Sequence, residues 1–181
     1  MNIEKTEFEG LIVLTPKVFD DNRGCFFESF NEKIVSEIIP NTLFVQDNIS
    51  ISKKNVIRGL HLQEPPYAQG KLVTVLKGKV IDIVVDVRKN SPTYGQYYSI
   101  ELSSENKNLL YIPIGFAHGF VSLEDESVFM YKCTNFYSKE SEVCINWNDP
   151  NIKINWGINN PILSEKDNNN CILLRNYNSP F

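Results

Sequence analysis

The sequence predicts an all-β protein, an antiparallel sandwich or jelly roll with one short helix near its start. About a dozen short runs rich in β-branched and aromatic residues recur at regular spacing, separated by turn residues. Only one segment repeats apolar residues at helical spacing. We find no internal repeat, linker or change in composition, so the pattern predicts one domain over residues 1–181.

The first forty residues are predicted to contain two strands and the helix. Gly10–Thr15 is a short apolar run, and Cys25–Phe30 follows the turn-forming cluster Asp20–Gly24. Apolar residues then recur at helical spacing between Asn31, which can cap a helix, and Pro40, which ends it.

Nearly all of the remaining chain is predicted to be strand. Val56–Pro66 reads as a strand ended by two prolines, and Lys77-Gly78 reads as the turn of a hairpin. Asn168–Asn170 is polar and indicates a loop near a loose C-terminus. The other predicted strands are Phe44–Ser52, Lys71–Leu76, Lys79–Val87, Tyr97–Leu102, Leu109–Ile112, Gly119–Leu123, Ser127–Tyr137, Cys144–Trp147 and Ile152–Trp156.

The strand in Val56–Pro66 carries residues around which a site can be built. Arg58 is a permanent cation suited to phosphate oxygens, and His61 can act as a base near neutral pH. Gly59 suggests a bulge or a close approach by something else. Lys71 heads the next apolar run, so these side chains can line an anion-binding cavity inside a barrel. The alternative is a surface arginine, a core histidine and a solvated lysine.

Composition limits the classes of function. The net charge of −4 argues against nucleic acid as the main partner. No apolar run approaches the roughly 20 residues of a membrane helix, and the N-terminal residues lack the apolar core of a signal peptide. We therefore expect a soluble cytoplasmic protein with no membrane partner. Free thiols are expected at all four cysteines, which form no CxxC pair: Cys25, Cys133, Cys144 and Cys171.

A second polar cluster, Pro113–Phe120, contains His118, the other of the two histidines. Proline and glycine around a histidine at a strand edge are similar to the second motif of cupin jelly rolls. A metal-binding cupin also needs a His-x-His with a following Glu in its first motif. His61–Glu64 supplies only one histidine there, so we expect no catalytic metal.

Two further stretches carry groups that can move or orient protons. Tyr131 and Tyr137 are six residues apart, so an extended strand puts them on one face. One phenol can donate a proton and the other can stack on a base, although two core tyrosines are the alternative. Leu163–Asp167 offers a carboxylate that can orient a histidine, or is a solvated charged tail.

Motifs between residues 23 and 167 match one known family in order. They are Arg23-Gly24-x-Phe26-x-Glu28, Gln46-Asp47-Asn48, Val56–His61, Pro65-Pro66 with Gln69–Val73, Asp86–Arg88 with Ser91–Thr93, Ile112-Pro113 with His118–Phe120, Tyr131–Cys133 with Tyr137, Trp147–Pro150, and Leu163–Asp167. On these motifs the chain resembles the dTDP-4-dehydrorhamnose 3,5-epimerases, cupin-fold enzymes of dTDP-rhamnose synthesis.

The resemblance implies a role for each site residue. His61 is implied to be the proton acceptor with Asp167 as its partner, and Tyr131 the proton donor. Lys71 is implied to lie by the C4 carbonyl, and Tyr137 to stack on the thymine. The residues implied to hold the nucleotide sugar are Arg23, Glu28, Gln46, Asn48, Arg58, Lys71, His118, Glu142 and Lys166. The family also implies a homodimer, whose partner chain can lend site residues, and no cofactor.

The chemistry of a 4-keto sugar agrees with these residue types. The C3 and C5 protons are next to the carbonyl, so removing either one gives an enolate. A histidine with a carboxylate partner can accept the proton, and a lysine can stabilise the oxyanion. A phenol can return a proton to the opposite face. No net redox change occurs, so neither a nicotinamide nor a metal is required.

Three alternatives remain on sequence alone. An enzyme that inverts only C3 or only C5, or acts on another nucleotide sugar, would use nearly the same groups. A sugar-nucleotide 3,4-ketoisomerase is disfavoured by Arg58–His61 in combination with Lys71 and Tyr131. A non-catalytic sugar-binding cupin is disfavoured, because binding alone does not need an acid on one face of the sugar and a base on the other.

Overall fold

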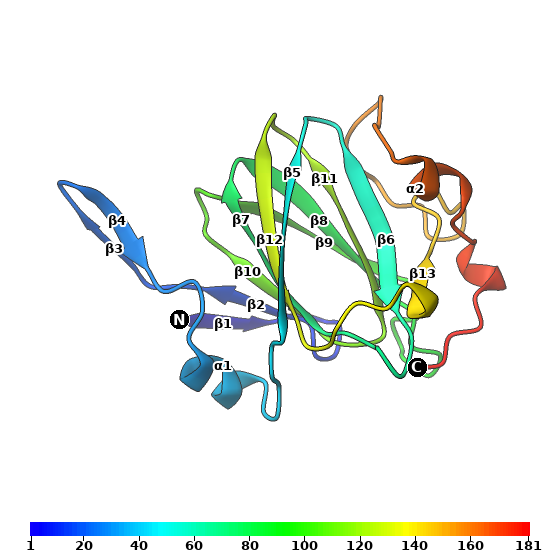
Figure 1. Cartoon of the computed structure of the whole chain (residues 1–181), viewed down its shortest axis with the longest axis horizontal. Coiled ribbons are helices and arrows are strands. Elements are labelled where there is room, and N and C mark those ends of the chain that lie inside the picture. The colour runs from blue at the N-terminus through cyan, green and yellow to red at the C-terminus, as the bar shows by residue number, and fades with distance from the viewer.

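The computed structural model describes residues 1–181 as two antiparallel sheets that face each other, with one hairpin that projects from them (Figure 1). The six-stranded sheet has the order β1 (Asn2–Lys5), β2 (Ile12–Thr15), β10 (Leu109–Ile112), β7 (Lys71–Lys77), β12 (Ser127–Cys133), β5 (Gln46–Ser52). The five-stranded sheet has the order β13 (Glu142–Cys144), β6 (Ile57–Gln63), β11 (Phe116–Ser122), β8 (Lys79–Asp86), β9 (Tyr97–Ser103). The predicted antiparallel jelly roll is confirmed.

The remaining elements are short. The projecting hairpin consists of β3 (Val18–Asp21) and β4 (Gly24–Phe27), which pair only with each other. There are two α-helices, α1 (Glu32–Ile38) and α2 (Glu165–Asn169), and two 3-10 turns at Lys139–Ser141 and Leu174–Asn176. None of the helices has the length and apolarity that crossing a bilayer requires.

Three apolar clusters hold these layers together. One fills the space between the sheets and includes the fully buried Val84, Leu110 and Phe129. Another packs the outer face of the five-stranded sheet against the segment after β13, including Trp156. The last joins the outer face of β2 and β10 to Ile38 of α1. β8 and β11 are covered on both faces, and β8 accordingly reads in the sequence as an apolar run interrupted by Asp82.

The predicted N-terminal helix is confirmed as α1. The side chain of Asn31 accepts hydrogen bonds from Lys33 N and Ile34 N, so it caps the helix as expected. Val35 is its buried residue, and the helix ends just before Pro40.

A bulge in β6 decides which side chains face inward. β6 pairs with β11 at His61↔His118 and, after a shift in register, at Arg58↔Phe120, so two residues of β6 stand opposite one of β11. Gly59 lies in this bulge with a φ of 131°, and a Cβ there would come within 2.5 Å of the β11 backbone. The extra residue allows Arg58 and His61, which are three apart, to line the same cavity. The bulge and the close approach predicted at Gly59 are both confirmed.

Lys77-Gly78 does not form the predicted hairpin. Gly78 does turn the chain, with a φ of 78°, but β7 belongs to the six-stranded sheet and β8 to the five-stranded sheet. A Cβ at Gly78 would lie 2.6 Å from Ser127 Oγ, so a side chain is excluded where the chain crosses between sheets. The turn was predictable, but its two strands pair with other partners.

Other differences concern the ends of elements. The strand predicted to reach Tyr137 ends at Cys133, and Ile152–Trp156 forms no strand. The strand predicted at Cys144–Trp147 is Glu142–Cys144 instead, which shares only Cys144 with the prediction. The last segment is irregular and is anchored by Trp156, whose indole N–H donates to a backbone carbonyl. The sequence also missed β1, β3 and α2, because elements of four or five residues are too short to show a periodicity.

The C-terminal region is not the loose tail that the sequence suggested. Asn168–Asn170 is not a loop throughout, because α2 extends to Asn169. Ser179 is buried, and Lys89 N donates a hydrogen bond to Phe181 O. The last residues therefore pack against the body of the protein.

The prediction of free thiols is wrong for one pair of cysteines. Cys144 and Cys171 form a disulfide with their Cα atoms 4.7 Å apart, whereas Cys25 and Cys133 are free. Two backbone hydrogen bonds between Ile172 and the chain at the end of β13 bring the pair together. The cysteines are 27 residues apart in the sequence, in no motif, so only the fold reveals the pairing.

Candidate active site

A cavity of about 640 Å³ opens between the two sheets. One wall carries side chains of β5, β7 and β12, the other carries side chains of β6 and β11, and the α2 region lines its rim. The cavity collects most of the predicted site residues: Gln46, Asn48, Arg58, His61, Lys71, His118, Tyr131, Tyr137, Glu142, Lys166 and Asp167. The predicted residues that lie outside it are Arg23 and Glu28.

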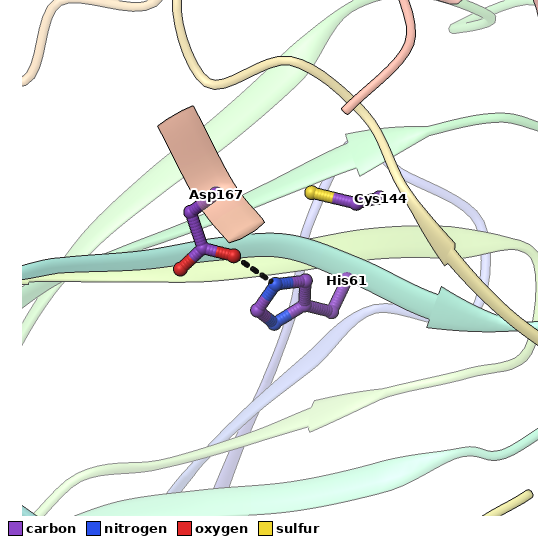
Figure 2. Close-up of side chains that lie close together, drawn as sticks. All are labelled: His61, Cys144 and Asp167. Atoms are coloured by element: carbon purple, nitrogen blue, oxygen red, sulfur yellow. Dashed lines mark hydrogen bonds and ion pairs between the residues drawn. The ribbon is translucent and has the colours of Figure 1, made fainter. Parts of the chain in front are cut away.

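His61 and Asp167 form a hydrogen-bonded pair on the wall built from the five-stranded sheet. The imidazole Nε2 lies 2.7 Å from Asp167 Oδ1 (Figure 2). A carboxylate only accepts hydrogen bonds, so Nε2 carries the proton and Nδ1 keeps its lone pair. Figure 2 shows the second ring nitrogen turned away from Asp167. His61 can therefore take up a proton at Nδ1 while Asp167 stabilises the imidazolium.

The α2 helix holds Asp167 in position. Ser164 caps this helix, and its Oγ accepts a hydrogen bond from Asp167 N at 3.1 Å. Burial by itself raises the pKa of the Asp167 carboxyl, but the hydrogen bonds from His61 and Ser164 outweigh burial and lower it. Asp167 thus stays ionised beside the imidazole at neutral pH.

Lys71 is a buried cation close to the proposed base. It begins β7, is 9% exposed, and its Nζ donates a hydrogen bond to His61 O at 3.3 Å. Burial lowers the pKa of its ammonium, an effect opposed by the nearby Cys133, Asp82 and Glu142. A positive charge in such a desolvated position can strongly stabilise an anion that develops next to it.

Tyr131 faces the cavity from the opposite wall. It lies in β12 of the six-stranded sheet and packs against Phe129, with ring centroids 6.1 Å apart. Burial raises the pKa of its phenol, so the hydroxyl keeps its proton at neutral pH. Tyr131 and His61 therefore present a proton donor and a proton acceptor from different sheets.

His118 is buried at the cavity wall and paired with a buried carboxylate. Its Nε2 lies 2.8 Å from Oδ2 of Asp82, a carboxylate with no exposed surface. Burial raises the pKa of Asp82, opposed by His118 and Lys71, and burial lowers the pKa of His118. Asp82 was not predicted as a functional residue. The sequence feature that could have revealed Asp82 is its position inside the apolar strand β8, because a buried carboxylate needs a hydrogen-bonding or charged partner.

Tyr137 belongs to a polar group at the rim. Its hydroxyl donates to Glu142 Oε2 at 3.0 Å, and Lys166 Nζ lies 2.6 Å from the same oxygen. Its backbone N–H donates to Gln46 Oε1, and its side chain is exposed. The idea that one extended strand carries both site tyrosines is wrong, because β12 ends at Cys133. Tyr137 lines the cavity from the loop that follows.

Arg58 and two amide side chains lie along the edge where β6 meets β5. The guanidinium donates from Nε to Ser52 Oγ at 3.1 Å and from an Nη to Ile51 O at 3.4 Å. Gln46 Nε2 donates to Asn48 Oδ1 at 3.0 Å. A fixed guanidinium with further N–H groups suits the oxygens of a diphosphate.

Arg23 and Glu28 lie on or next to the β3–β4 hairpin, which we call the arm (residues 18–27). Figure 1 shows the arm extending away from both sheets. The Arg23 side chain is 85% exposed and pairs with Asp21, and Glu28 accepts a hydrogen bond from Asn31. Neither residue reaches the cavity of its own chain.

One group of side chains has the chemistry of metal ligands. Ligand atoms of His61, Cys144 and Asp167 lie within 4.8 Å of one another (Figure 2). Cys144 is held in the disulfide with Cys171, so with that bond closed the group offers only an imidazole and a carboxylate.

Comparisons with known proteins agree on one family. A family model described as dTDP-4-dehydrorhamnose 3,5-epimerase matches residues 5–174. The chain is 54% identical over 170 residues to the dTDP-4-dehydrorhamnose 3,5-epimerase of Shigella flexneri, covering 93% of this chain and 94% of the relative. The crystal structure of the same enzyme from Elizabethkingia anophelis NUHP1 superposes with a TM-score of 0.93 at 48% identity, covering 99% of both chains. The 3,5-epimerase of Legionella pneumophila Philadelphia 1, solved with dTDP-4-keto-L-rhamnose, gives 0.91 at 46% identity, covering 96% of this chain and 93% of that chain.

Proposed function

The chain belongs to the dTDP-4-dehydrorhamnose 3,5-epimerase family, and we propose that His61, Asp167, Lys71 and Tyr131 carry out its reaction. The enzyme is an isomerase that inverts C3 and C5 of dTDP-4-keto-6-deoxyglucose to give dTDP-4-keto-L-rhamnose, in dTDP-rhamnose synthesis. The observation that carries the assignment of roles is the placement of His61 and Tyr131 on opposite sheets of one cavity.

Each inversion begins with removal of a proton next to the C4 carbonyl. Nδ1 of His61 accepts the proton of C3 or C5, and the ionised Asp167 stabilises the imidazolium that forms. The bonding pair of the C–H bond moves into the enolate, whose negative charge is centred on the C4 oxygen. Lys71 stabilises that oxyanion, a contribution of about 2.7–4 kcal/mol by analogy with deletion of an oxyanion-hole donor.

Inversion is completed from the other side of the sugar ring. The Tyr131 hydroxyl donates its proton to the face opposite the one from which His61 removed a proton. Burial raises the pKa of the phenol, so the hydroxyl still carries its proton at neutral pH. A histidine alone returns a proton only to the face that it serves, so the second wall is what makes inversion possible.

We assign the polar residues at the rim to the nucleotide. Tyr137 is exposed and available to stack on the thymine, while its hydroxyl donates to Glu142, which is in turn paired with Lys166. Arg58 faces the diphosphate, and the amides of Gln46 and Asn48 lie beside it. His118, held by Asp82, contributes from the floor of the cavity.

We propose a homodimer in which the arm of one chain reaches the cavity of its partner. The arm carries Phe19 and Phe26, which are 52% and 67% exposed, and β5 at the sheet edge carries the similarly exposed Ile49 and Ile51. Apolar side chains of this size, exposed on a projecting hairpin and an edge strand, are typical of an interface. The arm would bring Arg23 to the partner's nucleotide, as the family resemblance implies.

Mixed dimers test this arrangement. Arg23→Ala and His61→Asn enzymes are each expected to be inactive, but mixing their chains creates dimers with one complete site. The complete site combines the cavity of the Arg23→Ala chain with the arm of the His61→Asn chain, so random exchange restores about a quarter of wild-type activity. If Arg23 serves its own chain's cavity, mixing restores nothing.

The reaction itself is tested in deuterated water by following C3 and C5 of dTDP-4-keto-6-deoxyglucose with NMR. The proposed function predicts deuterium at both carbons and inversion at both. Label at a single carbon indicates a mono-epimerase, and movement of the carbonyl from C4 to C3 indicates a ketoisomerase. No label at either carbon contradicts the proposal.

A further inference from the structure

A cysteine lies directly beside the His61–Asp167 pair. Cys144 in β13 is the register partner of His61 in β6, so their side chains point to the same face of the sheet. The neighbouring pair, Leu60 and Ile145, exchanges both backbone hydrogen bonds. His61 and Cys144 are therefore a non-hydrogen-bonded pair, the type in which side chains come closest. Figure 2 shows the sulfur lying close to both members of the pair.

The partner of this cysteine is attached to the same helix as Asp167. Cys171 follows α2 closely, and its disulfide joins the end of that helix to β13. The disulfide is not the only link between these segments. Ile172 N donates to Cys144 O at 2.9 Å, and Asn146 N donates to Ile172 O at 2.8 Å. These hydrogen bonds hold Cys171 next to β13 whether the disulfide is open or closed, so reduction frees the Cys144 thiol without moving it away from His61.

We propose that reduction of Cys144–Cys171 creates an inhibitory site for Zn²⁺, formed by His61, Cys144 and Asp167. The three ligand atoms already lie within 4.8 Å of one another. Zinc prefers imidazole nitrogen, thiolate sulfur and carboxylate oxygen, and three protein ligands leave a fourth position for water. Small side-chain rotations bring these atoms to the spacing that Zn–N and Zn–O bonds of about 2.0–2.2 Å and a Zn–S bond of about 2.3 Å require. His61 and Asp167 line the cavity, so zinc can reach them from solvent through its opening.

Formation of the zinc site takes two steps, reduction of the disulfide and binding of the ion. A dithiol reductant transfers two electrons and two protons to the disulfide, giving two protein thiols and the oxidised, disulfide form of the reductant. Zinc then binds the Cys144 thiolate and releases its proton. The proton on His61 Nε2 shifts to Nδ1, so Nε2 offers its lone pair to the zinc in place of its hydrogen bond to Asp167, and the protonated Nδ1 can no longer serve as the base. This consequence rests on the proposed role of His61.

The test compares zinc binding and epimerase activity with the disulfide closed and open. The protein is prepared oxidised, or reduced by a dithiol that is then removed under inert gas, and one equivalent of zinc chloride per chain is added. Binding is read as protection of Cys144 from alkylation, measured by mass spectrometry. We expect zinc to protect Cys144 and lower activity about 100-fold in the reduced protein, the lower end of what a general base contributes. A chelator restores activity, and the oxidised protein is unaffected.

Two variants separate this site from other zinc sites. Cys171→Ser leaves Cys144 permanently free, so this variant is zinc-sensitive without a reductant. Cys144→Ser removes the sulfur ligand and is insensitive in both states, each relative to its own activity without zinc. Both variants are made in a Cys25→Ser background, which removes the exposed thiol of the arm.

The outcomes distinguish the zinc site from the catalytic assignment. Absence of zinc protection in both the reduced protein and Cys171→Ser overturns the proposed site. Equal inhibition of Cys144→Ser overturns it as well, because the ion then binds elsewhere. Protection of Cys144 with undiminished activity supports the zinc site but contradicts His61 as the base.

Discussion

The two walls of the cavity hold a proton in different ways. On the wall of the five-stranded sheet, His61 has a charged partner, Asp167, 2.7 Å away, and this pair favours uptake of a proton. On the wall of the six-stranded sheet, Tyr131 packs against Phe129, and burial raises its pKa so that its proton is retained. One wall is an ionic acceptor and the other a desolvated donor.

This difference supports the proposed direction of proton transfer, from the sugar to His61 and from Tyr131 to the sugar. The neighbouring Asp167 carboxylate favours proton uptake by His61, and burial away from water keeps the proton on the Tyr131 hydroxyl. Lys71 connects the walls, because it begins a strand of the six-stranded sheet and donates to the backbone carbonyl of His61. In the proposed mechanism its charge stabilises the enolate that forms between the two proton transfers.

Removing the acceptor should have the largest effect. His61→Asn keeps a polar side chain of similar bulk and removes the titratable base. We expect exchange at C3 and C5 to fall by at least about 100-fold, the lower end for loss of a general base. The measurement is deuterium incorporation by NMR, with circular dichroism and dTDP affinity as controls. Wild-type exchange in a folded variant would rule out His61 as the base.

The alkaline side of the pH profile separates Lys71 from the donor. Burial lowers the Lys71 pKa and raises the Tyr131 pKa, so we expect the lysine to lose its proton before the tyrosine as the pH rises. Enolate formation should then fall by about tenfold per pH unit as the single proton is lost. Because Tyr131→Phe retains Lys71, its exchange reaction should show the same alkaline limb as wild type. If the alkaline fall in exchange is absent from Tyr131→Phe, the group that titrates is Tyr131 and not Lys71.

Loss of the stacking ring should affect binding more than chemistry. Tyr137→Ala should weaken dTDP binding by about 1–3 kcal/mol, the range for base–aromatic stacking. Phe136→Ala is the matched control, because this neighbouring aromatic is exposed and does not line the cavity. Titration calorimetry with dTDP measures both variants. Equal affinities for wild type and Tyr137→Ala would remove Tyr137 from the nucleotide site.

Metal removal should have no effect on the oxidised enzyme. In the proposed mechanism Lys71 supplies the positive charge at the enolate oxygen, and His61 is the one histidine in the first cupin motif, so we expect no Lewis acid to be needed. Activity is measured after prolonged chelation, with and without added divalent ions. Loss of activity that one particular ion restores would contradict the metal-free mechanism.

The strands of the two walls were largely predictable from sequence, because β-branched runs and turn residues fix them locally. Gly59 also revealed the bulge, since a glycine inside a strand often marks a bulge or a close approach of another backbone. The period-2 rule alone would have placed Arg58 and His61 on opposite faces. The chemistry of a cation and a base near one another predicted a shared anion-binding cavity, and the bulge supplies the geometry that allows it.

The features that sequence could not reveal depend on contacts between distant segments. The sequence predicted Asp167 as the partner of His61, but not the five-residue helix α2 that positions it, which is too short to show a periodicity. The Cys144–Cys171 bond depends on two backbone hydrogen bonds near Ile172. Arg23 was assigned to the site, but the fold holds it on the arm, away from the cavity of its own chain.

The central claim is that acceptor and donor act from opposite walls, and Tyr131→Phe tests it most directly. This change removes one hydroxyl and keeps the ring against Phe129, while His61, Asp167 and Lys71 remain. In deuterated water we predict that label still enters C3 or C5 with retained configuration, while formation of inverted product falls sharply. Inverted product at the wild-type rate would contradict the account. Simultaneous loss of exchange and inversion would also contradict it, because Tyr131 would then be needed to form the enolate.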